Sequence, residues 1–270
     1  VHCRANIAER AFKITPLNSY DVVIHANETR YWVYMFGSIL FGIGVVRMFA
    51  SLDEAAREAA LRKAGVVLII ANLVMPAYGF LNPKHDMSWH RNLPLHLCGV
   101  NYALVGLNCF FKNEKLFMFS AFTGTIGGVH ALLTPQLTIG DAPLVLLDYY
   151  FKHSAIVVMP LIMARSFGFR FPKYGWVKTY VAVAVLTTVV GLFNWWLNTY
   201  FPASITANYM YMWEAPKADN PFVVDLPRPW YILPLHGGLI LHLILINALY
   251  RWGTPIDEYT RQPWMRRHFT

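Results

Sequence analysis

A thiol and an imidazole in this sequence have the chemistry of a nucleophile and its base. Cys98 closes the motif L-P-L-H-L-C and stands near the start of a long apolar run. Pro94 suits the first turn of a helix, so Cys98 is expected in the first or second turn. The positive end of a helix lowers the pKa of a nearby thiol, and the thiolate is the attacking form. Cys98 is therefore a candidate nucleophile, and the other reading is a small apolar residue packed in a buried helix.

The base for Cys98 is expected from another segment. His96 and Cys98 are separated by roughly 200° on a regular helix, so they cannot pair within it. His153 is the first candidate, with His96 and His130 behind it. Asn101 and Tyr102 share the thiol's side of the helix and are predicted to orient a substrate carbonyl.

The segment that carries His153 also contains two charged residues. Asp148 and Lys152 are four residues apart, a spacing that lets them pair on one helix face. Ionisable groups inside a membrane segment are unfavourable and often functional. This intramembrane ion pair has two readings, a packing contact or part of a site. The three cysteines, Cys3, Cys98 and Cys109, match no metal motif, and neither a metal nor a cofactor is predicted.

The composition defines the elements that must position these residues. The chain has 270 residues, of which 56% are hydrophobic and 14% charged. Soluble domains carry about 25% charged residues. We therefore predict an all-α, polytopic helical membrane protein. The net charge of +8 is expected from loops on one side of the membrane, not from nucleic-acid binding.

Apolar runs predict about seven transmembrane helices. The linker 51–63 is expected to form a separate short helix, with a capping box from Ser51 to Glu54. Gly124 and Gly128 predict close helix packing around the fourth run. The seven runs cover residues 31–50, 64–80, 93–111, 116–133, 142–167, 176–196 and 230–250.

The expected positions of Cys98 and His153 along their helices constrain where the fifth helix begins. Cys98 is expected within about 8 Å of the start of its helix, but His153 lies about 16 Å past Ala142. The two side chains are predicted to meet only if the fifth helix begins later, near Asp148.

The chain is predicted to have three parts: a polar leader (1–30), a transmembrane helical domain (31–250) and a basic, aromatic tail (251–270). Lys and Arg are more numerous in the loops on the C-terminal side. The positive-inside rule then places the C-terminus in the cytoplasm, or in the matrix of an organelle. The expected location is a bacterial inner membrane or an organellar one such as the mitochondrial inner membrane.

A series of short motifs resembles the YwaF-like integral membrane family. The resemblance implies a helical membrane fold, and an animal relative is described as a cysteine-dependent acyltransferase acting on ether phospholipids. It would make Cys98 the acyl-accepting nucleophile and His153 the general base, with membrane lipids as partners. His96 and Asn208 also fall on motif positions and are expected to orient substrate. The motifs are L-P-L-H-L-C (93–98), A-L-L-T-P-Q-L (131–137), F-K-H (151–153), G-L-F-N (191–194), N-Y-M-Y (208–211) and P-W-Y-I-L (229–233).

Two other functions fit the same sequence. The chain would serve as a non-catalytic accessory subunit of a larger membrane assembly, such as a respiratory complex, if it kept the fold without the activity. The leader and tail would then contact other membrane subunits. A transporter would use Asp148 and Lys152 as a coupling pair, but no internal repeat is visible.

Overall fold

A computed structural model describes residues 22–81, 88–137, 140–172, 174–216, 224 and 226–253. Most of the predicted leader and tail, residues 1–21 and 254–270, lies outside these ranges. The described chain is mainly α-helical, which confirms the predicted all-α class. Its elements are β1 (Val22–Val23), α1 (Thr29–Ser51), α2 (Glu54–Leu81), α3 (Leu97–Phe111), α4 (Glu114–Leu133), β2 (Gln136–Leu137), α5 (Pro143–Ser166), α6 (Gly175–Tyr200), a 3-10 turn (Tyr209–Tyr211) and α7 (Ile232–Gly253).

Five of these helices are long and apolar enough to cross a membrane: α1, α4, α5, α6 and α7. Large apolar side chains point outward from them, including Leu40, Leu192 and Leu241. A bilayer accommodates such surfaces, whereas water does not. Helix α3 is apolar but has only 15 residues, about 22 Å of helix, and α2 has charged residues in its first turns. The count of seven spans therefore stays a prediction.

Helix α2 corrects the predicted linker helix. Residues 54–63 are not a separate element but the first turns of α2, which runs unbroken from Glu54 to Leu81. The Asp53 carboxylate accepts a hydrogen bond from the Ala56 N–H at 2.8 Å and so begins the helix. Ser51 instead donates to the carbonyl of Met48 in α1. Alanine, glutamate and arginine are strong helix formers, so nothing interrupts the helix before its apolar part.

A tight turn joins α3 to α4. Lys112 adopts a left-handed conformation after α3, and Asn113 caps α4 by accepting hydrogen bonds from the next turn. The Asn108 side chain accepts from the Asn113 N–H at 2.7 Å. Lys112 also pairs with Glu58 of α2 at 2.6 Å. These contacts hold α2, α3 and α4 together at one end.

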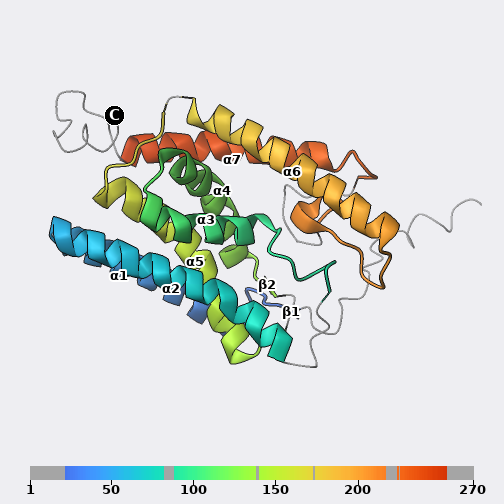
Figure 1. The fold of residues 1–270 in the computed structure, drawn as a ribbon, viewed down its shortest axis with the longest axis horizontal. Coiled ribbons are helices and arrows are strands. Elements are labelled where there is room, and N and C mark those ends of the chain that lie inside the picture. Colours follow the sequence, from blue (N-terminus) through green and yellow to red (C-terminus); the bar gives the residue numbers. More distant parts are fainter. Residues whose placement is uncertain are drawn as a thin grey trace, which may run out of the picture.

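Three helices form the centre of the bundle, as Figure 1 shows. Helix α4 packs against both α3 and α5. Helices α1 and α2 flank this centre on one side, where α1 packs on α5 and α2 packs on α3. Helices α6 and α7 pack against each other and against α4 on the opposite side.

Loops that the sequence places on one side of the membrane contact one another in pairs. Strand β1 pairs antiparallel with β2, joining the end of the leader to the loop after α4. Arg30 pairs with Asp141 at 2.7 Å in the same region. The Tyr209 hydroxyl donates to the Trp89 carbonyl at 2.8 Å, joining the long loop after α6 to the segment before α3.

Two glycines let α4 and α5 approach closely, as their spacing predicts. A Cβ atom at Gly124 would lie 2.8 Å from the carbonyl oxygen of Ile156. A Cβ atom at Gly128 would lie 2.8 Å from the carbonyl oxygen of His153 and 2.5 Å from a methyl group of Val157. All three distances are shorter than normal contact, so only glycine fits without a shift of α5.

Replacing Gly128 with alanine is expected to destabilise the fold by about 1–3 kcal/mol, the usual penalty for overpacking. The change forces α5 away from α4, because one new contact is with backbone. Gly44→Ala in α1 is the matched control, since a Cβ atom there meets nothing within 4 Å. Thermal unfolding in detergent gives the melting temperatures of both variants. Equal melting temperatures for the two variants would contradict the close packing.

Candidate functional site

Cys98 is the second residue of α3, which places its thiol in the first turn. The helix begins at Leu97 because His96 still has an extended backbone and the residues before it form turns. The thiol points toward α4. A Cβ atom at Gly127 would lie 3.0 Å from the sulfur, so the missing side chain of Gly127 makes room for it.

His153 lies in the third turn of α5, and its tautomer is defined by one hydrogen bond. The Nδ1 atom is 2.7 Å from the carbonyl oxygen of Tyr149, one turn earlier. A carbonyl oxygen only accepts, so Nδ1 carries the hydrogen. In the neutral ring, Nε2 then has the free lone pair that a general base needs. The Tyr149 ring packs on the imidazole with centroids 4.2 Å apart.

The structure brings Cys98 and His153 to the same level of α4. The sulfur lies against Gly127, and the backbone of His153 lies against Gly128, the next residue. Tyr149 lies near Cys98 and also packs against the His153 ring. In the part of the chain that the structure describes, no hydrogen bond joins the thiol to the imidazole. Catalytic hydrogen bonds are often long before substrate binds.

The fifth helix covers nearly the predicted residues 142–167, and the condition of a later start is not met. Helix α5 begins at Pro143, which suits the first helical position, and not near Asp148. His153 is therefore about 15 Å along its helix. The depths match because α3 starts at Leu97, four residues later than the apolar run that begins at Leu93. The residues before Leu97 form turns and bends and not the first turns of the helix.

An aromatic wall lies beside the start of α3. The His96 ring packs against Tyr209 and Tyr211, with centroids 5.2 and 5.9 Å away. Tyr211 also interacts electrostatically with Cys98. Burial lowers the pKa of His96, which keeps its ring neutral. The predicted substrate-orienting residue His96 is thus next to Cys98, in a site enclosed by aromatic rings.

Asparagine side chains hold this wall in place. Asn194 of α6 is fully buried and bonds to both the N–H and the carbonyl of Tyr209, at 3.1 and 2.9 Å. The Asn208 side chain accepts from the N–H groups of Trp213 and Glu214 and donates to the Glu214 carbonyl. All these Asn208 contacts are within its own loop, so this residue shapes the loop that carries Tyr209.

The other predicted site residues lie deeper. Asn101 is buried, donating to the Leu97 carbonyl and accepting from the Thr123 hydroxyl at 2.8 Å. Lys152 pairs with Asp148 at 2.8 Å, and its ammonium group lies 5.5 Å from the ring centre of Tyr102. This charged pair is adjacent to His153 in sequence and contacts α3 through Tyr102.

Two further histidine contacts join helices in the described part of the chain. His130 of α4 and His242 of α7 meet with their Nε2 atoms 3.1 Å apart. Because the Nδ1 of His242 donates to the Gly238 carbonyl, its Nε2 accepts from His130. Tyr180 and His236 link α6 to α7 at 3.2 Å. Among the described residues, no group of three His, Cys, Asp or Glu side chains could hold a metal ion.

Sequence reasoning missed the residues that connect the nucleophile to the base. Gly127 lies beside the glycine pair that predicts close packing, but one sequence does not show which glycine faces a thiol. Tyr149 is one turn before His153, a spacing that places the two rings together. Tyr211 lies in the motif N-Y-M-Y, where only Asn208 was singled out.

Together the apolar helices and the enclosed polar site define an integral membrane protein of the polytopic helical class. The TMEM164 family, a family of transmembrane proteins, matches residues 25–248. The chain therefore belongs to the TMEM164 family. The resemblance to YwaF-like proteins is not confirmed by this comparison. No curated protein and no solved structure gives a significant match.

Proposed function

We propose that this protein is a lipid acyltransferase in which Cys98 is the nucleophile and His153 the general base. The observation that supports this most strongly is the arrangement on α4, where consecutive glycines face the sulfur of Cys98 and the backbone of His153. Cys98 and His153 are 55 positions apart in the sequence, and the fold places them at the same height along α4. Burial favours the neutral form of the Cys98 thiol, so a base such as His153 is needed to form the thiolate.

The reaction would proceed in two steps. The His153 Nε2 atom takes the thiol proton, and the sulfur attacks the ester or thioester carbonyl of an acyl donor. The bond to the donor's leaving group breaks, that group takes the proton from His153, and a thioester remains on Cys98. In the second step His153 takes the proton from a lysolipid hydroxyl, whose oxygen attacks the thioester. The carbon–sulfur bond breaks, and His153 returns the proton to the thiol.

Backbone N–H groups in the first turn of α3 are the best candidates to stabilise the oxyanion. The first N–H groups of a helix have no partner within it. The first helical bond here runs from the Val100 N–H to the His96 carbonyl, so the amides of Cys98 and Gly99 precede it. The Asn101 amide, the other candidate, donates to the Leu97 carbonyl instead.

The remaining site residues would enclose and orient the lipid. His96 and the loop held by Asn208 line the approach to Cys98, while Asn101, Tyr102 and the Asp148–Lys152 pair fix α3, α4 and α5 behind it. The partners would be membrane lipids. The C-terminus would lie on the cytoplasmic or matrix side of the membrane, where positively charged loops gather.

Trapping the acyl-enzyme tests this proposal. The full chain in phosphatidylcholine nanodiscs is quenched in acid, digested and mapped by mass spectrometry. We expect an acyl group on Cys98 that neutral hydroxylamine removes, because hydroxylamine cleaves thioesters. Cys109 on the same helix should stay unmodified, since it is buried and its thiol donates to the Val105 carbonyl. An unmodified Cys98, with the phospholipids unchanged over time, would instead favour a non-catalytic subunit.

A further inference from the structure

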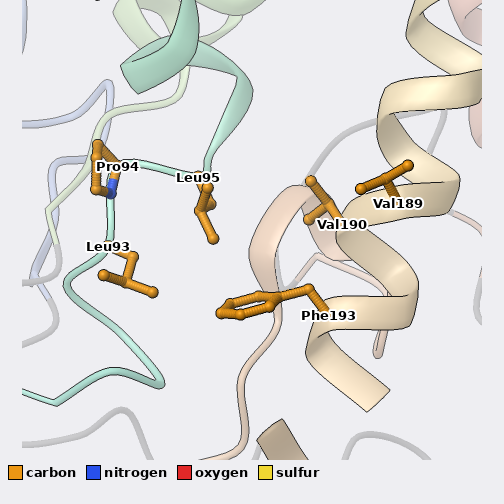
Figure 2. A pocket seen from close by; sticks show the side chains of 6 residues that line it. All are labelled: Leu93, Pro94, Leu95, Val189, Val190 and Phe193. Carbon is orange, nitrogen blue, oxygen red and sulfur yellow. The ribbon is translucent and has the colours of Figure 1, made fainter. Parts of the chain in front are cut away.

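An apolar groove of about 380 Å³ lies between α6 and the segment that leads into α3. Figure 2 shows its two walls facing each other, with the Phe193 ring pointing from α6 toward the opposite segment. Every part of its lining is apolar. The residues that line it are Leu93, Pro94, Leu95, Val189, Val190 and Phe193.

One side of the groove is anchored in the protein and the other faces the membrane. Val190 is buried in a cluster with Tyr209, and Leu95 and Phe193 pack on the same cluster. Val189 belongs to the outward face of α6, with 57% of its surface exposed. With apolar walls and the exposed edge at Val189, the groove is accessible to hydrocarbon chains. Burying a polar head group there would be unfavourable.

The groove is within reach of the reactive sulfur. Leu95 is three residues before Cys98, and three consecutive Cα–Cα steps cover at most about 11 Å. The hydrocarbon core of a bilayer is about 30 Å thick, so one acyl chain spans roughly 15 Å. A chain attached at Cys98 is therefore long enough to reach the groove.

We propose that this groove binds the hydrocarbon tail of the acyl chain that is transferred through Cys98. The proposal rests on the acyltransferase function and adds the subsite that receives its substrate. The rings and methyl groups of Phe193, Val190 and Leu95 would hold the tail, and Phe193 would limit the shape of chain that fits. The carbonyl end would stay at the first turn of α3.

Photocrosslinking tests the occupant directly. The full chain is reconstituted in nanodiscs of phosphatidylcholine that carries a diazirine near the end of one acyl chain. We expect label on peptides that contain residues 93–95 and 189–193. Val189→Trp places a bulky ring at the groove edge and should reduce this label about tenfold, the loss expected when roughly two methylene groups are no longer buried.

Val185→Trp is the matched control. Val185 is one turn earlier on α6, is 61% exposed and does not line the groove. The Val185→Trp variant should keep the amount of label within about twofold of that on the unmodified chain. This change is much smaller than the loss expected when two methylene groups are no longer buried. Phe193→Ala enlarges the groove and should move label onto Val190. Label spread evenly along α6, or an equal loss in both tryptophan variants, would overturn the proposal.

Measuring both the groove label and the Cys98 thioester in the same samples tests the acyl subsite and the acyltransferase proposal separately. A thioester on Cys98 without label in the groove would refute the acyl subsite and leave the proposed function standing. Label in the groove without any thioester would refute the acyltransferase and leave a lipid-binding groove.

Discussion

Replacing Cys98 with serine is expected to abolish the acyl-enzyme and to lower lipid acyl transfer by roughly 10³-fold or more, because nucleophile and base act as a unit. A serine hydroxyl is a far weaker nucleophile than a thiol and needs stronger activation. Serine fits the space beside Gly127, so the fold should be retained. Time courses of phospholipid composition in nanodiscs, measured by mass spectrometry, give the rate.

Cys109→Ser is the control for this prediction. Cys109 lies on the same helix, about 16 Å further along, and is 1% exposed. Serine there can keep the hydrogen bond to the Val105 carbonyl. Transfer should therefore continue at close to the normal rate. Equal losses in the two variants would mean that serine disturbs α3 as a whole, and an active Cys98→Ser protein would end the proposed mechanism.

Replacing His153 with glutamine is expected to lower the rate of thioester formation by about 10²–10⁴-fold, the usual contribution of a general base. Glutamine can still donate a hydrogen bond to the Tyr149 carbonyl, but its amide does not accept a proton near neutral pH. Single-turnover formation of the Cys98 thioester isolates this step from later lipid exchange.

The pH dependence distinguishes a base from a packing residue. Burial favours the neutral thiol of Cys98, but raising the pH still increases its thiolate fraction without a base. The difference in thioester-formation rate between His153→Gln and the unmodified chain should therefore become smaller as the pH rises. His242→Gln, which removes the contact with His130 and leaves His153 in place, should show no such trend. A deficit that is constant with pH in His153→Gln would indicate a structural role for His153.

Most of the helical architecture could be predicted from the sequence. The long apolar runs gave the fifth, sixth and seventh helices within a few residues, because hydropathy and helix length are local properties. The first turns of α2 were misjudged for a different reason. Hydropathy separates the charged residues 54–63 from the apolar run, but helix propensity and the Asp53 cap join them into one helix.

The candidate site was only partly predictable. Residue type and the proline before Cys98 indicated a thiol near a helix start, and His153 was the first choice of base. The spacing of Asp148 and Lys152 predicted the pairing that the structure shows at 2.8 Å. The start of the third helix was misjudged, because an apolar run does not show that residues 93–96 form turns and that α3 begins at Leu97.

By itself, the amino-acid sequence determined that this chain is a helical membrane protein with a thiol and an imidazole in apolar segments. Those conclusions depend on composition and on distances along one helix, where 3.6 residues per turn define every angle. Only the tertiary structure decided that the Cys98 sulfur and the His153 backbone lie against neighbouring glycines of α4, with Tyr149 near both. Contacts between helices depend on which small side chains let the backbones approach, and a single sequence does not show which faces will meet.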